Sequence, residues 1–146
     1  MTINWFPGHM HKARKEIAKV MDEIDAVIEV LDARLPLSSE NPLVNSLRKG
    51  KPVLKILNKN DLADPAKTAE WLEYFNSQEN IQAISLDHDQ KKLIASIPEM
   101  CKRMVPGRAN KERPVRVMIM GIPNVGKSTL INALLGRKIA KVGNEP

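Results

Sequence analysis

The chain has 146 residues, 42% of them hydrophobic and 27% charged, which is enough for one domain with a real core. No apolar run approaches the ~20 residues of a membrane-spanning helix, and charged residues follow the N-terminus where a signal peptide would have its apolar core. The net charge of +6 favours an anionic partner such as nucleic acid, although a basic surface without function would give the same total. A single cysteine, Cys101, lies among apolar residues, which predicts a buried thiol in a cytoplasmic protein without disulfides.

The first predicted element is an amphipathic helix. From Met10 onward, apolar residues recur at intervals of three and four, which is the spacing of one helical face. This apolar face consists of Met10, Ala13, Ile17, Val20 and Ile24. The opposite face carries Lys12, Arg14, Lys15 and Lys19. These basic side chains are compatible with a solvated surface or with an RNA-facing one, and the pattern leaves both interpretations open.

Beyond this helix, predicted strands alternate with predicted helices. Short apolar runs predict strands at residues 26–31, 53–57, 81–85 and 115–120. Asn41 and Asp64 each precede a proline, a pattern that begins a helix. A further helical stretch covers about 90–104, and Pro98 either kinks it or starts a new helix. The alternation predicts a parallel sheet with helices on both faces and a ligand site at the C-terminal edge of the strands.

The strand at 115–120 leads into a phosphate-binding motif. G-x-x-x-x-G-K-S runs from Gly121 to Ser128, and a helical run follows at 130–135. In such a loop the backbone N–H groups converge on phosphate oxygens, Lys127 can reach the β- and γ-phosphates, and the Ser128 hydroxyl can ligate Mg²⁺. The nucleotide contacts that we predict here are Asn124, Val125, Gly126, Lys127, Ser128 and Thr129. The alternative is a glycine-rich turn with a surface lysine, and the correct flanks on both sides argue against it.

The strand at 53–57 leads into a second motif, Asn58-Lys59-Asn60-Asp61. The Asp61 carboxylate can accept hydrogen bonds from N1–H and the 2-amino group of guanine, two adjacent donors that adenine does not offer. Lys59 can lay its aliphatic stem along the base, and Asn58 can tie this loop to the phosphate loop. N-K-x-D alone is a weak motif, but together with a phosphate loop in the same chain it predicts a site for GTP or GDP.

In an ordinary Ras-like GTPase the phosphate loop precedes N-K-x-D, whereas here the order is reversed. In this order and in its motifs the chain closely resembles the circularly permuted GTPases of the ribosome biogenesis GTPase A (YlqF-like) family. The motifs are W-F-P-G-H-M at 5–10, L-D-A-R-L-P at 31–36, S-S-E-N-P at 38–42, N-K-x-D at 58–61 and G-I-P-N-V-G-K-S-T at 121–129. The resemblance covers essentially the whole chain.

The resemblance implies a P-loop NTPase fold, a three-layer α/β sandwich of the Ras-like type in circular permutation. Residues 1–104 would form the base-recognition half, 105–114 a linker, and 115–146 the phosphate-loop strand and helix. In the implied sheet only the 26–31 strand separates the two motif strands, so their ends lie about 10 Å apart at ~4.8 Å per strand. Ser85 and Leu86 would form the base loop, whose backbone contacts the guanine oxygen.

Two features of the family have no counterpart in this sequence: the switch loops and the C-terminal RNA-binding domain. We therefore expect the N-terminal part of a longer GTPase, with an incomplete sheet. In that sheet the strand at 115–120 would become an exposed apolar edge, which is an aggregation liability.

The resemblance also implies Mg²⁺-dependent hydrolysis of GTP during assembly of the large (50S) ribosomal subunit, by a monomer without other metals. The rRNA would be contacted by basic residues of the first helix, of the linker and of 137–141. The resemblance suggests His9 for positioning the attacking water, and helix capping or packing against aromatic neighbours is the alternative. Two other functions stay open: a guanine-nucleotide-dependent RNA-binding module without catalysis, and an ATP-using P-loop protein.

Overall fold

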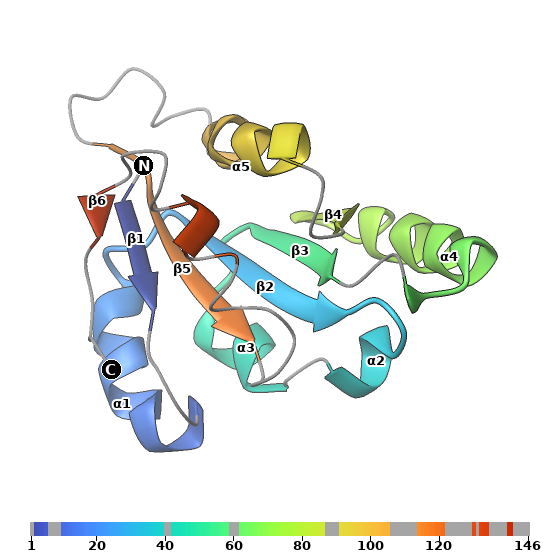
Figure 1. The fold of residues 1–146 in the computed structure, drawn as a ribbon. Helices are drawn as coiled ribbons and strands as arrows, with labels where there is room; N and C mark the ends of the chain where they lie inside the picture. The colour runs from blue at the N-terminus through green and yellow to red at the C-terminus, as the bar shows by residue number, and fades with distance from the viewer. Residues whose placement is uncertain are drawn as a thin grey trace.

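The computed structural model describes residues 2–5, 10–39, 42–58, 62–86, 91–105, 114–121, 130, 132–134 and 140–141. Within this part of the chain the strands form one parallel sheet in the order β4-β3-β2-β5-β1-β6 (Figure 1). The strands are β1 (Thr2–Trp5), β2 (Ala26–Asp32), β3 (Val53–Asn58), β4 (Ile81–Leu86), β5 (Arg116–Gly121) and β6 (Ala140–Lys141). The helices are α1 (Met10–Met21), α2 (Pro36–Ser39), α3 (Pro42–Leu47), α4 (Pro65–Asn76) and α5 (Lys91–Met104).

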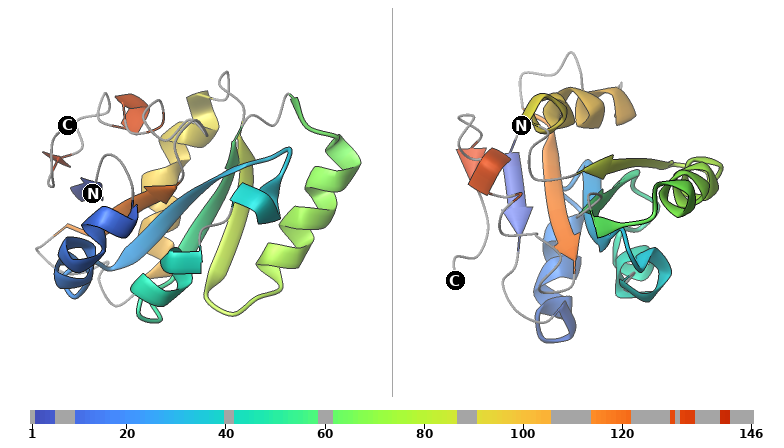
Figure 2. Two further views of the ribbon diagram at one scale, coloured as in Figure 1. Left: turned by 90° about the horizontal axis from the view of Figure 1, so that it is seen from below. Right: turned by 45° about the vertical axis from the view of Figure 1, so that its right-hand side comes forward.

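Helices cover both faces of the sheet, so its inner strands are mostly apolar on both sides (Figure 1 and Figure 2). Ile28 and Val30 of β2 point into a core closed by α5, where Ile97 and Cys101 are fully buried. The alternate residues of β2 face the other way, because side chains of a strand alternate between faces. Val27 packs there with residues of α1 and α3, and the end of β2 packs with α4. The predicted three-layer α/β fold is confirmed.

The helix starts and ends follow local chemistry. The side chain of Asp64 accepts a hydrogen bond from the N–H of Ala66 at 3.0 Å, so it caps α4 as the sequence predicts. Pro98 lies inside one continuous α5 and does not start a new helix. Lys49 and Gly50, after α3, have φ angles of +50° and +76°, and this turn leads the chain back into β3.

One expectation about the sheet is wrong. The strand at 115–120 is not an exposed edge, because β1 pairs with β5 in parallel from Thr2 opposite Arg116 to Trp5 opposite Ile119. The strand β1, in which Ile3 is fully buried, covers that edge of β5, and β6 in turn pairs with β1. Four residues with alternating polarity form too short a pattern to reveal a strand, and the pairing depends on a partner more than 100 residues away.

Candidate nucleotide site

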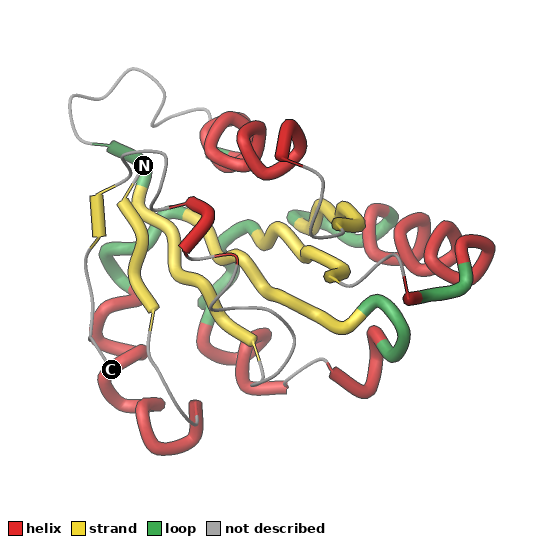
Figure 3. The backbone as a smooth tube through the Cα atoms, viewed as in Figure 1, coloured by secondary structure: helices red, strands yellow, loops and turns green. Residues whose placement is uncertain are grey.

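The two nucleotide motifs begin on strands that flank β2. Asn58, the last residue of β3, lies in register with Asp32 of β2. On the opposite side of β2, Val30 lies in register with Gly121, the last residue of β5. Only β2 separates these strand ends, which confirms the predicted strand order. The C-terminal ends of β3 and β5 therefore lie at the same edge of the sheet (Figure 3).

The phosphate motif begins at a close approach between two strands. A Cβ atom at Gly121 would stand 2.9 Å from the carbonyl oxygen of Val30, a backbone atom that cannot rotate away. Sequence reasoning assigned this glycine to a tight backbone conformation. The contact supplies a different reason, because only a residue without a side chain lets β5 lie this close to β2 before the loop departs.

The helix expected after the phosphate loop is present in the described residues. Residue 130 and residues 132–134 are helical. Leu130 and Leu134 are buried in the core that α5 closes, together with Val117 and Ile119 of β5. A spacing of four places both leucines on one face of a helix. The strand and the helix that must flank a phosphate loop thus pack on each other.

The base-loop assignment falls at the end of β4. Ser85 and Leu86 lie in register with Leu57 and Asn58, so β4 ends beside the strand that carries N-K-x-D. The Leu86 side chain is buried in the core under α5. A buried side chain leaves the backbone of this segment as the part that a base could contact, and this assignment stays a prediction.

The remaining predicted site residues lie outside the described part of the chain. They are His9, Lys59, Asp61, Asn124, Val125, Gly126, Lys127, Ser128 and Thr129. Their assignments stay predictions, and so does the placement of the linker at 105–114, of which only residues 105 and 114 are described.

Sequence reasoning missed a charged pair at the same edge, between the two motif strands. The Asp32 carboxylate accepts hydrogen bonds from three donors of Arg34: the backbone N–H at 2.9 Å, Nε at 3.0 Å and Nη2 at 2.7 Å. The hydrogen bond and charge of Asp32 raise the pKa of Arg34 above its ordinary value. The spacing of an aspartate and an arginine two residues apart, just after a strand, is the sequence signal that could have revealed the pair.

A second polar feature lies away from this edge. Lys55 Nζ lies 2.8 Å from Glu29 Oε1 and 5.0 Å from the centroid of the Phe75 ring, and both charged side chains are buried. They form part of a cavity of about 450 Å³ between α3 and α4. Because Glu29 and Lys55 lie three residues before the ends of their strands, this cavity opens on a face of the sheet and not at the nucleotide edge.

None of the described helices is long and apolar enough to cross a bilayer.

Comparisons with known proteins agree with this arrangement. Residues 116–146 match the family described as 50S ribosome-binding GTPase. The chain is 46% identical to ribosome biogenesis GTPase A of Priestia megaterium over its full length, which is 53% of that relative. It is 34% identical to the Thermotoga maritima protein of the same name, over 99% of this chain and 50% of the relative. A solved structure described as the GDP-bound structure of TM YlqF superposes with a TM-score of 0.58 at 30% identity, covering 84% of this chain and 48% of that one.

The chain thus spans about half the length of the curated relatives that it matches. In its motifs, its strand order and these matches, it is similar to the ribosome biogenesis GTPase A family of circularly permuted GTPases.

Proposed function

We propose that this chain forms the guanine-nucleotide-binding part of a GTPase that acts in assembly of the large ribosomal subunit. The observation that carries the proposal is the register of β3 and β5 on the two sides of β2, which brings Asn58 and Gly121 to one edge of the sheet. Two strand spacings of ~4.8 Å separate β3 from β5 by about 10 Å. One nucleotide can span that distance with its base at the first loop and its phosphates at the second.

Base selection is assigned to the loop after β3. The Asp61 carboxylate would accept the two adjacent donors of guanine, and a base without them would leave a desolvated charge unpaired. Lys59 would cover one face of the base, and the backbone at Ser85 and Leu86 would contact the guanine oxygen. These roles predict a strong preference for guanine over adenine nucleotides.

The phosphates are assigned to the loop after β5. The backbone N–H groups from Asn124 to Thr129 and the Lys127 ammonium would hold the phosphate oxygens. The Ser128 hydroxyl is a hard oxygen donor, which is the donor type that Mg²⁺ prefers. When bound, Mg²⁺ would neutralise negative charge on the phosphates during hydrolysis. His9 would orient the attacking water from its neutral form.

Contact with rRNA is assigned first to α1. Arg14, Lys15 and Lys19 are exposed on this helix, while Ile17 and Met21 anchor its other face in the core. Exposed cations on a rigid helix can neutralise phosphates of the RNA backbone and release counterions. The linker and residues 137–141 would add to the same basic surface. We assign this action to the cytoplasm, because the bacterial relatives are named for ribosome biogenesis.

The test is an equilibrium titration of the chain with GDP, GTP and ATP in the presence of Mg²⁺. We expect both guanine nucleotides to bind and ATP to bind at least a hundredfold more weakly, because a mismatched buried polar group costs about 3 kcal/mol. Binding of ATP as tightly as GTP would overturn the proposal.

A single-turnover assay distinguishes the proposed GTPase from the alternative, a nucleotide-dependent RNA-binding module without catalysis. Equimolar chain and radiolabelled GTP are incubated with Mg²⁺, with and without large ribosomal subunits. A GTPase converts the bound nucleotide to GDP, whereas a module returns GTP intact.

A further inference from the structure

We propose that Asp32 and Arg34 form a brace that fixes the spacing between the end of β3, where N-K-x-D begins, and the end of β5, where the phosphate loop begins, with Arg34 as a positioning residue for guanine nucleotides. The proposal rests on the proposed function, because it assigns a role within that same nucleotide site. It concerns the turn at residues 32–35, which joins β2 to α2.

The turn is closed by hydrogen bonds within itself. Besides the three donors of Arg34 that reach the Asp32 carboxylate, the N–H of Leu35 donates to the Asp32 carbonyl oxygen at 3.0 Å. Asp32 is largely buried, with its side chain 12% exposed, and a charge-assisted fork of this kind holds both groups in one geometry. The turn is therefore a rigid unit and not a loose connection.

The same unit is fixed to the strand that carries the base motif. Asp32 lies in register with Asn58, and the N–H of Ala33 donates to the Asn58 carbonyl oxygen at 2.8 Å. This bond extends the ladder between β2 and β3 one residue past the end of β2. The backbone at the start of N-K-x-D thus cannot move without moving the turn.

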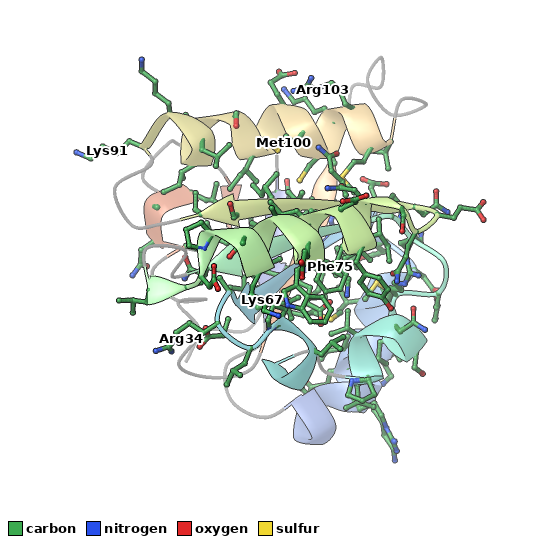
Figure 4. The ribbon with its side chains drawn as sticks, turned by 90° about the vertical axis from the view of Figure 1, so that its right-hand side faces the viewer. Arg34, Lys67, Phe75, Lys91, Met100 and Arg103 are labelled. Carbon is green, nitrogen blue, oxygen red and sulfur yellow. The ribbon has the colours of Figure 1, made fainter. Side chains whose placement is uncertain are left out.

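On its other side β2 carries the start of the phosphate loop. Gly121 packs against the backbone of Val30, two residues before Asp32. The turn consequently stands at the middle of the edge that the nucleotide must span. Figure 4 shows Arg34 on the same side of the molecule as Lys91, the first residue of α5, and away from Arg103 near the end of that helix. The start of α5 follows the C-terminal end of β4 in the chain.

A brace of this kind acts only on ligands that touch both loops at once. A small misplacement of one loop against the other lowers the affinity for a ligand that spans them, since binding depends on geometry held within about 0.5 Å. A ligand held by one loop alone is indifferent to the spacing. This difference separates a positioning role from a merely structural one.

The experiment compares GDP with inorganic tripolyphosphate on Asp32→Asn, Arg34→Ala and Arg34→Lys variants. A fluorescent GDP analogue reports binding, and tripolyphosphate is measured by competition. Asp22→Asn is the matched control, because it removes an ion pair of 2.8 Å with Lys49 at an exposed site between α1 and the turn after α3. Thermal unfolding of every variant is measured alongside.

We expect Asp32→Asn and Arg34→Ala to lower the affinity for GDP about tenfold or more. The affinity for tripolyphosphate should stay unchanged, and Arg34→Lys should restore part of the affinity for GDP. The control should match the unsubstituted chain. Unchanged GDP affinity in both variants, or equal losses for GDP and tripolyphosphate, would overturn the brace while leaving the guanine site standing. Failure of the unsubstituted chain to bind GDP would instead overturn the proposed function and the brace with it.

Discussion

The carbonyl oxygen of Val30 lies 2.9 Å from the point where a Cβ atom on Gly121 would stand. A Gly121→Ala substitution therefore forces β5 away from β2 at the start of the phosphate loop. We expect the free energy of unfolding to fall by about 1–3 kcal/mol, as for other overpacked sites, and GDP binding to weaken at least tenfold. Urea unfolding and a nucleotide titration measure the two effects.

Gly50→Ala is the control for this prediction. Gly50 has a φ of +76° and no atom within 4 Å of an added Cβ, so alanine there meets backbone strain without a collision. It should lower stability by about 1 kcal/mol and leave GDP affinity unchanged. Equal GDP binding by Gly121→Ala and the unsubstituted chain would refute the assigned role of the contact.

The buried Glu29–Lys55 pair gives a second prediction. Lys55→Met leaves the Glu29 carboxylate buried without its cation and removes the ammonium from the Phe75 ring, and we expect about 3–5 kcal/mol of destabilisation. The double variant Glu29→Leu/Lys55→Met removes both charges and should recover most of that loss. Denaturant unfolding of the two single variants and the double variant gives the coupling energy. A double variant as unstable as Lys55→Met alone would contradict the account.

The thiol of Cys101 gives a prediction on pH. Burial raises its pKa from 9.0 to about 12, so the folded state keeps the proton that the unfolded state loses. The unfolded state then binds fewer protons above pH 9, and stability falls as pH rises from about 9 towards 12. Cys101→Ala lacks this contribution, so its unfolding free energy should decline less over that window. At pH 9, iodoacetamide should alkylate the native thiol far more slowly than the urea-unfolded one; equal rates would contradict its burial.

The basic face of α1 gives a prediction on salt. We replace Arg14, Lys15 and Lys19 by alanine, one at a time. Each single variant should bind large-subunit rRNA more weakly, and the slope of log K against log salt should fall by about 1. Lys67→Ala is the control, because this exposed lysine lies on α4 and not on α1 (Figure 4). Binding is measured at several salt concentrations. Identical slopes for the α1 variants and the control would remove α1 from the RNA surface.

Apolar runs and caps could be read from the sequence because each depends on neighbours in the chain. The strand at 53–57 and the Asp64 cap are of this kind, and both are confirmed. Thr2–Trp5 could not be recognised, since its burial depends on pairing with β5. The Asp32–Arg34 pair was missed for a related reason: its motif was noticed, but its hydrogen bonds depend on the turn that the folded strands create.

The most direct test of the guanine site is a nucleotide swap at Asp61. Replacing the carboxylate by an amide, in Asp61→Asn, exchanges an acceptor for a donor at the position assigned to N1–H and the 2-amino group of guanine. Xanthine carries an oxygen in place of that amino group. We predict that the variant binds xanthosine diphosphate more tightly than GDP, whereas the unsubstituted chain binds GDP more tightly. A variant that still prefers GDP as strongly as the unsubstituted chain would contradict base recognition by Asp61.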